Sequence, residues 1–495
     1  MRIKTVTALL LLFALLSLCM TVPVSAEDEI KGKYEMTASY TNTGDKIRYM
    51  HIWSDSMDEI WNSIDHTGGF RITEIKLYAD WDVYEEKTLD YYNCHVVVDL
   101  NGHSIIRHTE DGSQIKNGGV FRISNDAHLQ IDDSDPDSAG YDGIRGGVIT
   151  GGANTNGGGA FTLTDRSKLT ITGGTVYRCT TNEYGGAVML KGTSVKHPEF
   201  KMAGGRIYFC QTTGAWSNSH GGAVYCDNGS VVLSNCRIDS CYSEDNGGAV
   251  YMNGGSLNAQ NVLFTGNHCL DFGGAIFISG GSLRVARSRF SSNEAKKDGG
   301  AVYADSDEGA QFRDCIFNKN KSYGDGGALY VNDDRTYLID TDVIANSASG
   351  YGGGVYVDSM DDIGVKGLVR IYNNSGKNGR NNLTLQDGFG TRALLSDGGL
   401  YEGSSIGLSS TGKNVKYAED ISVFQMGYFF SDSGDLVMEE TYQREAPMLA
   451  SVFSDGGAIP IVSAAALFLL FGAGTYAVLA KKKKAGEEKK NEKSA

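Results

Sequence analysis

The sequence predicts an all-β chain in which short strands coil into a parallel β-helix. A Gly-Gly pair with an apolar residue two positions after it recurs from Gly158 to Gly352, every 26 or 27 residues except for one longer step. After each pair, apolar residues of one column alternate with residues of a mostly aromatic column. This alternation is the period-two pattern of a strand, whose successive side chains point to opposite faces. Only Pro136 and Pro198 fall between residues 93 and 390, where a missing N–H would interrupt a hydrogen-bonded ladder.

Each repeat carries two apolar columns that we expect to stack from one coil to the next. The first column is Phe161, Val188, Val224, Val250, Ile276, Val302, Leu329 and Val355, and the second is Val176, Ile207, Ile238, Phe264, Phe290, Phe317, Val343 and Ile371. The longer step contains an insertion at residues 211–220. Equivalent residues of a parallel coil lie on adjacent rungs ~4.8 Å apart, which explains why the columns repeat. About ten coils, roughly 50 Å in all, are expected.

The two ends of the chain predict export and membrane anchoring. An apolar run after Arg2 and Lys4 ends in small residues at Ala26, as in a cleaved signal peptide. Residues 458–480 are 23 residues without a charge, enough for a membrane-spanning helix, and four lysines follow directly. Because positive residues mark the cytoplasmic side of a span, we expect a short cytoplasmic tail and an extracellular N-terminal part.

A coil stack needs its open ends closed. Ser56 and Glu59 have the spacing of a capping box, and Met57, Ile60 and Trp61 follow on one helical face, so a short helix is expected to cap the first coil. The expected division of the chain is 1–26 signal peptide, 27–92 N-terminal segment and cap helix, 93–390 β-helix repeats, 391–435 C-terminal β cap, 436–457 linker, 458–480 transmembrane helix and 481–495 cytoplasmic tail.

The charge of the chain disfavours nucleic acid as a partner. It holds 60 Asp and Glu residues against 45 Lys and Arg residues, a formal net charge of −15. A surface this acidic repels phosphate backbones and anionic lipid heads, so we expect no nucleic-acid binding.

The motif pair GGA(V/I/L) and FxxN, as in "GGAVY", "GGAIF" and "GGALY" with "FTGN", "FSSN" and "FNKN", resembles the repeats of chlamydial polymorphic outer-membrane proteins. The stretch "HVVVDLNGHSI", with "LQIDDS" and "GGVITGG", looks like the opening of right-handed β-helix surface proteins of Gram-positive bacteria. The resemblance covers roughly residues 93–390. It implies a right-handed, pectin-lyase-like fold and a bacterial cell surface. Adhesion is implied by analogy of fold alone, since this chain lacks the autotransporter barrel of the chlamydial proteins.

An aromatic column is the main candidate binding surface. It consists of Tyr225, Tyr251, Phe277, Tyr303, Tyr330 and Tyr356, which alternate with the aliphatic columns and so point outward. Flanked by small alanines such as Ala249 and Ala275, it could form a shallow track on which sugar rings or a partner's side chains stack. The alternative is structural, because neighbouring rings also stabilise each other across strands.

A second column occupies one turn position of successive coils. It consists of Cys179, Cys210, Cys241, Asn267, Asn293, Asn320, Asn346 and Asn374. We interpret the asparagines as an internal amide ladder. Because asparagine fills the same column afterwards, the cysteines fit buried packing better than a disulfide. A zinc site is disfavoured because no histidine repeats in their register.

Catalytic and metal sites have weaker support. The acidic turn formed by Asp132, Asp133, Asp135 and Asp137 is a candidate for Ca²⁺ but lacks the spacing of an EF-hand loop, and no other cofactor is expected. Carbohydrate-degrading enzymes with this fold need placed carboxylates, and the motifs of polygalacturonases are missing here. Three functions therefore remain open: an adhesin or display protein that contacts a glycan or protein surface, a carbohydrate-active enzyme, and a structural spacer.

Overall fold

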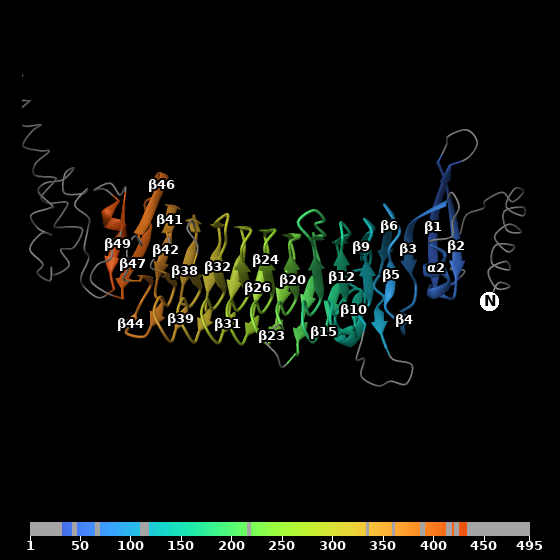
Figure 1. Cartoon of the computed structure of the whole chain (residues 1–495), viewed down its shortest axis with the longest axis horizontal. Coiled ribbons are helices and arrows are strands. Elements are labelled where there is room, and N and C mark those ends of the chain that lie inside the picture. Colours follow the sequence, from blue (N-terminus) through green and yellow to red (C-terminus); the bar gives the residue numbers. More distant parts are fainter. Residues whose placement is uncertain are drawn as a thin grey trace, which may run out of the picture.

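Most of the chain consists of short strands joined by tight turns. The computed structural model describes residues 32–41, 47–64, 70–108, 118–214, 219–332, 336–358, 362–386, 392–411, 418–419 and 425–432. The strands stack one behind another into an elongated rod, with β1 and β2 at one end and β49 at the other (Figure 1).

One coil contains four strands. The coil that starts at Val250 runs through β24 (Val250–Asn253), β25 (Ser256–Gln260), β26 (Leu263–Thr265) and β27 (His268–Cys269), and β28 then begins the next coil. Each strand pairs in parallel with its counterpart one coil later, as Val250 with Ile276. The strands therefore form four ladders along the rod, which we number in the order in which one coil visits them.

The first ladder holds the strands that follow the glycine pairs. They are β8 (Phe121–Ile123), β12 (Phe161–Thr164), β16 (Val188–Lys191), β20 (Val224–Asp227), β24, β28 (Ile276–Ser279), β32 (Val302–Asp305), β36 (Leu329–Val331) and β40 (Val355–Val357). The ladder continues at its two ends with β5 (Lys87–Leu89) and β45 (Leu383–Leu385), which follow no glycine pair.

The second ladder forms a separate sheet with the N-terminal strands. It holds β3 (Phe70–Leu77), β6 (His95–Asp99), β9 (His128–Asp132), β13 (Lys168–Ile171), β17 (Glu199–Met202), β21 (Ser230–Ser234), β25, β29 (Ser282–Ala286), β33 (Ala310–Arg313), β37 (Thr336–Ile339), β41 (Asp362–Gly367), β46 (Arg392–Leu400) and β48 (Ala418–Glu419).

The third ladder carries the second apolar column and joins the first ladder through β47. It holds β4 (Trp81–Val83), β7 (Ile105–Arg107), β10 (Val148–Thr150), β14 (Thr175–Tyr177), β18 (Arg206–Tyr208), β22 (Arg237–Asp239), β26, β30 (Arg289–Ser291), β34 (Ile316–Asn318), β38 (Asp342–Ile344), β42 (Arg370–Tyr372), β47 (Ser405–Ser410) and β49 (Phe429–Ser431).

The fourth ladder consists of two-residue strands. It holds β11 (Ala153–Asn154), β15 (Thr180–Thr181), β19 (Gln211–Thr212), β23 (Tyr242–Ser243), β27, β31 (Glu294–Ala295), β35 (Lys321–Ser322), β39 (Ser347–Ala348) and β43 (Ser375–Gly376). It ends at β44 (Gly379–Arg380), which pairs antiparallel with β43. Two short 3₁₀ helices, η1 (Tyr141–Gly143) and η2 (Met426–Tyr428), lie outside the ladders.

Both apolar columns predicted from the repeat align in the structure. Val250 pairs with Ile276 in the first ladder, and Phe264 pairs with Phe290 in the third. These side chains are fully buried, and the rings of Phe264, Phe290 and Phe317 stack inside the coil at centroid distances of 4.9 and 4.6 Å. The core is thus one continuous stack of equivalent side chains, and burial of this apolar surface is the main stabilising term.

The paired glycines allow adjacent coils to approach closely at this corner. Gly247 has φ of 69°, a left-handed conformation that glycine adopts without strain. A Cβ on Gly248 would lie 2.2 Å from the carbonyl oxygen of Gly274 in the next coil. The first glycine is therefore required by the turn, and the second by the packing of one coil on the next.

The parallel stack extends beyond the boundaries expected at residues 93 and 390. At the N-terminal side β3 already pairs in parallel with β6, and at the C-terminal side β46 pairs in parallel with β41. The solenoid therefore has about 12 turns instead of the ten expected. Strands that lack the glycine pair continue the stack, which is why the repeat alone underestimates its length.

An antiparallel hairpin and a short helix lie at the N-terminal end. Strands β1 (Tyr34–Thr41) and β2 (Ile47–Ser54) form the hairpin, and β1 pairs with β3. Helix α2 (Met57–Ser63) begins as expected, with the Ser56 hydroxyl accepting the N–H of Glu59 at 3.3 Å. Its Trp61 ring lies 5.7 Å from that of Trp81 and 5.3 Å from that of Phe121, both in the core. That the helix closes the first coil stays a prediction.

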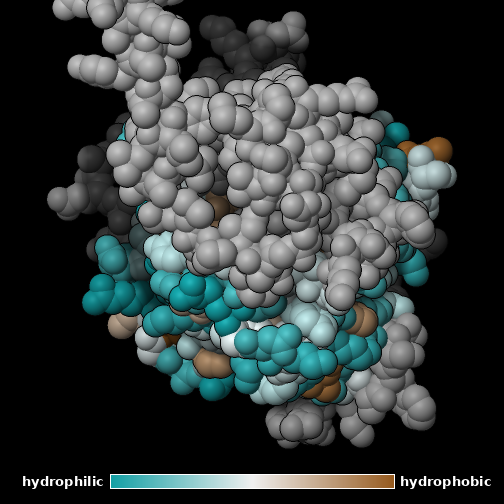
Figure 2. Space-filling view, turned by 90° about the vertical axis from the view of Figure 1, so that its left-hand side faces the viewer, coloured by the Kyte–Doolittle hydropathy of each residue, from teal (hydrophilic) through white to brown (hydrophobic). Residues whose placement is uncertain are grey.

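Among the described residues, no helix is long and apolar enough to cross a membrane. The expected signal peptide (1–26), linker (436–457), span (458–480) and tail (481–495) lie outside the described residues. In the end-on view, the described surface that is visible is mostly hydrophilic, with scattered hydrophobic residues (Figure 2).

Candidate binding surface

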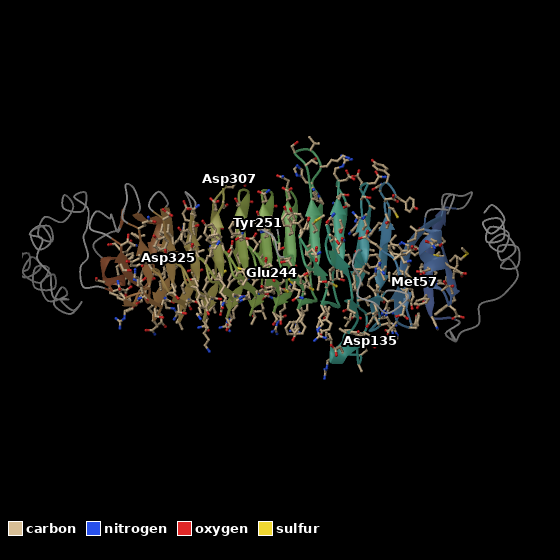
Figure 3. The ribbon with its side chains drawn as sticks, turned by 60° about the horizontal axis from the view of Figure 1, so that its bottom comes forward. Met57, Asp135, Glu244, Tyr251, Asp307 and Asp325 are labelled. Atoms are coloured by element: carbon tan, nitrogen blue, oxygen red, sulfur yellow. The ribbon has the colours of Figure 1, made fainter. Side chains whose placement is uncertain are left out.

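The six aromatic residues predicted as a binding surface form one continuous row on the outer face of the first ladder. The row is Tyr225, Tyr251, Phe277, Tyr303, Tyr330 and Tyr356, and Tyr251 is labelled in the middle of the rod in Figure 3. Neighbouring ring centroids are 4.8 to 5.2 Å apart, and the ring planes differ by 3 to 27°. The parallel register of the strands produces this stacking, because it places equivalent residues one rung apart. We call these six residues the aromatic row.

A second set of rings packs against the aromatic row. Tyr184 lies 4.4 Å from the ring of Tyr225, and His220 lies 4.3 Å from the ring of Tyr251. Each of these residues directly precedes the first glycine of a pair, and it contacts the row one coil further on. Phe272, which has the same position in its repeat, lies 5.1 Å from the ring of Tyr303. The sequence analysis missed this column, although its position before the glycines was a usable signal.

The stacking limits what the row can offer to a ligand. A ring such as Tyr251 has neighbours on both faces, so its edge and hydroxyl are left for contact. The flanking alanines, among them Ala249 and Ala275, have no exposed surface, so they do not line an open track as expected. They are buried because they lie at the turn where the glycine pairs bring adjacent coils together. The row therefore presents ring edges and phenolic hydroxyls.

The hydroxyls of the row remain protonated donors. Burial, with the nearby Asp227 carboxylate, raises the pKa of Tyr225, and burial raises the pKa of Tyr251. At the C-terminal end of the row the donors are already engaged. The Tyr330 hydroxyl donates to Asp358 Oδ2 at 2.8 Å, and the Tyr356 hydroxyl donates to Gln386 Oε1 at 2.7 Å. The open end of the row is thus nearer Tyr225.

Two carboxylates lie beside the aromatic row, at the turn that leads into the first ladder. Asp245 is 9% exposed, and burial together with a hydrogen bond to the Asp271 side chain raises its pKa to about 6. Asp271 also pairs with Lys297 Nζ at 2.7 Å. The Nδ1 atom of His220 lies 3.6 Å from Asp245 Oδ2, and burial lowers the pKa of this imidazole to about 4. Asp245 and Asp271 can therefore share one proton at mildly acidic pH.

The asparagine column forms the internal ladder expected from the sequence. Both the main-chain N–H and the side-chain amide of Asn267 donate to Asn293 Oδ1 at 3.0 Å. The same pair of bonds recurs from Asn293 to Asn320, Asn320 to Asn346 and Asn346 to Asn374, at 2.9 to 3.0 Å. Asn382, which the sequence analysis did not include, receives the last pair from Asn374. These residues are buried, and their side-chain oxygens accept hydrogen bonds from the backbone N–H groups of the turn.

The cysteines continue this column toward the N-terminus. Cys179, Cys210 and Cys241 are buried, and all three are free thiols. Burial raises the pKa of Cys241 to about 12, so its thiol stays protonated at neutral pH. The backbone N–H of Cys241 donates to Asn267 Oδ1 at 3.1 Å, which joins the cysteine and asparagine parts of the column.

In the acidic turn, the Asp133 carboxylate accepts hydrogen bonds from the backbone. Asp133 accepts the N–H of Gly102 through Oδ1 and the N–H of Gly147 through Oδ2, both at 2.7 Å. Asp132 accepts from Gln130, whereas Asp135 lies on a turn that projects from the rod (Figure 3). Within the described ranges, no group of three or more His, Cys, Asp or Glu side chains is placed to hold a metal ion.

Comparison with known proteins agrees with this architecture. A family model described as the right handed beta helix region matches residues 206–375. The match and the parallel ladders together show a right-handed β-helix fold. The matched region contains the complete aromatic row. No curated protein and no solved structure matches this β-helix chain.

Proposed function

We propose that this β-helix protein is a membrane-anchored bacterial surface protein that binds a glycan or a protein on a neighbouring or host cell. The uninterrupted aromatic row carries the proposal. Aromatic residues with a polar tip are favoured at recognition surfaces, because they combine apolar contact area with a hydrogen bond. The six half-buried to buried rings repeat at one spacing along the rod, which suits a repetitive partner.

The mode of contact follows from the stacking. Since the ring faces pair with each other, a ligand would meet ring edges and the hydroxyls near the Tyr225 end. Among the described residues, the hydroxyls of Tyr225 and Tyr251 have no protein hydrogen-bond partner. Sugar hydroxyls are both donors and acceptors, so a row of phenols can bind them in register with the rungs.

The cellular setting of the proposal rests on the ends of the sequence. The expected leader at 1–26, span at 458–480 and lysine-rich tail at 481–495 place the β-helix outside the cell, as in Gram-positive surface proteins. The net charge of −15 supports the expectation that nucleic acid is not a partner.

The test removes the hydroxyls and keeps the rings. Tyr225→Phe combined with Tyr251→Phe is expected to weaken binding in a glycan-array and cell-binding screen of the full chain, while Tm stays within a few degrees. Tyr208→Phe with Tyr372→Phe, on the third ladder, is the matched control and should bind like the parent chain. Equal binding by all three proteins would show that the aromatic row is not the binding surface. No binding by the parent chain would leave the enzyme and the structural spacer as the remaining functions.

A carbohydrate-active enzyme is the second candidate, and the Asp245 and Asp271 pair favours it. A shared proton beside a binding surface is typical of acid–base sites. Glycosidases, however, hold their two carboxyl groups ~5 to 9.5 Å apart, across the scissile bond. Asp245 and Asp271 are close enough to share a proton, so the pair would act as one acid–base group, and a glycosidase would need a further carboxylate across the scissile bond. Release of reducing or unsaturated sugars from polygalacturonate by the full chain would nevertheless establish this function.

A further inference from the structure

The arginines of the described residues divide into paired and unpaired groups. Seven of them lie within 4.0 Å of a carboxylate oxygen: Arg122, Arg145, Arg166, Arg178, Arg206, Arg237 and Arg370. Six other arginines with described side chains have no such partner. Arg107 is buried and Arg380 lies on β44, whereas Arg284, Arg287, Arg289 and Arg313 are all exposed and lie close together in the sequence. In a chain with an excess of acidic residues, four unpaired guanidinium groups within two coils need an explanation.

The register places these four residues on one corner of the rod. Arg284 lies on β29 of the second ladder and Arg289 begins β30 of the third, with Arg287 at the turn between them. Arg313 lies on β33, directly beside Ala286 of the preceding coil. The main chain from Arg284 to Arg289 spans at most ~16 Å. We call these four residues the arginine corner.

Apolar surface adjoins the arginine corner. In the third ladder Leu263 pairs with Arg289, and Arg289 pairs with Ile316. Leu263 is 43% exposed, which is unusual for leucine on this surface. The Arg289 guanidinium is therefore flanked by two aliphatic side chains, one on each neighbouring rung. A partner at this corner meets positive charge and apolar surface together.

We propose that the arginine corner binds an anionic polysaccharide. The guanidinium group is planar and always charged, and it matches the two oxygens of a carboxylate, sulfate or phosphate group. Four such groups spread over a strand face and a corner suit an extended polymer with repeated anionic groups better than one small anion. Leu263 and Ile316 supply the contact for the apolar face of a sugar ring.

Other polyanions fit less well. A site for single-stranded nucleic acid combines positive charge with aromatic rings on which the bases stack. Among the described residues, none of the four arginines packs on an aromatic ring, so the corner lacks such rings. An acidic peptide shares the carboxylate chemistry but not the sugar ring, so it serves as a separate arm of the test. The corner lies on the second and third ladders, so this inference is independent of the aromatic row.

The experiment measures binding of the full chain to heparin, a sulfated probe, and to polygalacturonate, a carboxylated probe. The parent chain is expected to bind at least one of them, with an affinity that falls as salt rises. The variant R284Q/R287Q/R289Q/R313Q should bind at least about tenfold more weakly and with a smaller salt dependence, because up to four ion contacts are lost. Replacing the four arginines by lysines should give intermediate affinity, since charge is kept but the planar fork is lost.

The matched control removes the same charge from paired arginines elsewhere. The variant R122Q/R145Q/R166Q/R178Q should keep the affinity of the parent chain within about twofold, because these residues are already neutralised by carboxylates. All variants should show the circular dichroism spectrum and thermal midpoint of the parent chain. The proposal is wrong if the parent chain binds neither polysaccharide, if both glutamine variants lose affinity equally, or if poly-glutamate binds as tightly as the sugar polymers.

Discussion

At the residue scale, one turn position shows how the coil selects its side chains. Asn293 donates its backbone N–H and its side-chain amide to Asn320, donates to Phe264 O at 3.0 Å, and accepts both donors of Asn267. A carboxamide is the group that can donate and accept at once in this geometry. Cysteine at the same position fills the space but makes only weak hydrogen bonds, so the cysteine coils depend more on packing.

Asn293→Ala should destabilise the protein strongly. The substitution removes the acceptor of two buried donors on Asn267 and one hydrogen bond to the Phe264 carbonyl, so we expect a loss of about 2 to 4 kcal/mol. The measurement is the urea midpoint of the full chain followed by circular dichroism. Asn258→Ala, on the outer face of β25, is the control and should shift the midpoint little. Equal shifts for both variants would contradict the ladder as a source of stability.

Asp245 should make stability depend on pH. Burial and the hydrogen bond that protonated Asp245 donates to Asp271 raise the pKa of Asp245 in the folded state to about 6, from an ordinary value of 3.8. Between these values the folded state binds more protons than the unfolded state, so this group's contribution to stability falls as pH rises from about 4 to about 6. Asp245→Asn keeps a donor to Asp271 and removes the charge. The variant should exceed the parent chain in Tm at pH 7.5, and the difference should shrink at pH 4.5.

Thermal melting at both pH values, with Asp307→Asn as a control on another turn, tests this expectation. A constant difference between Asp245→Asn and the parent chain at the two pH values would show that the two carboxylates do not share a proton.

At the element scale, no strand is stable by itself. Apart from the N-terminal hairpin, β3, β41, β46 and β47, strands are two to five residues long and gain their hydrogen bonds from the coils before and after. The glycine pair allows this close stacking, because it removes side chains from a corner where backbones meet. The pair is thus a requirement of the coil-to-coil contact, and its 26- to 27-residue spacing is the length of one turn.

Gly274→Ala should disturb the contact between two coils. The added Cβ would lie 2.1 Å from Gly300 O and 2.7 Å from the backbone of Glu294, so one backbone segment must move. We expect a loss of at least about 2 kcal/mol, seen as a lower urea midpoint. Gly427→Ala is the matched control, because its Cβ would meet nothing within 4 Å. An unchanged midpoint for Gly274→Ala would mean that the coils can separate without cost.

At the scale of the whole molecule, the inward positions of the rod keep the same type of side chain from coil to coil, whereas the outward positions do not. Inward columns run the length of the stack and differ only in which apolar or amide group fills each rung. Outward columns change from coil to coil, so aromatic residues gather on the first ladder and unpaired arginines at the corner between the second and third. Such an architecture presents several surfaces at once, each made from a few neighbouring coils.

The sequence by itself determined the coil length, the two apolar columns, the asparagine ladder and the aromatic row. Each is a comparison between equivalent positions of successive repeats, and a parallel register places such positions one rung apart. Only the tertiary structure decided how different columns meet. The packing of Tyr184 and His220 on the row, the pairing of Asp245 with Asp271, and the unpaired arginine corner all depend on the angles at which turns join the ladders, and no periodicity in the chain records those angles.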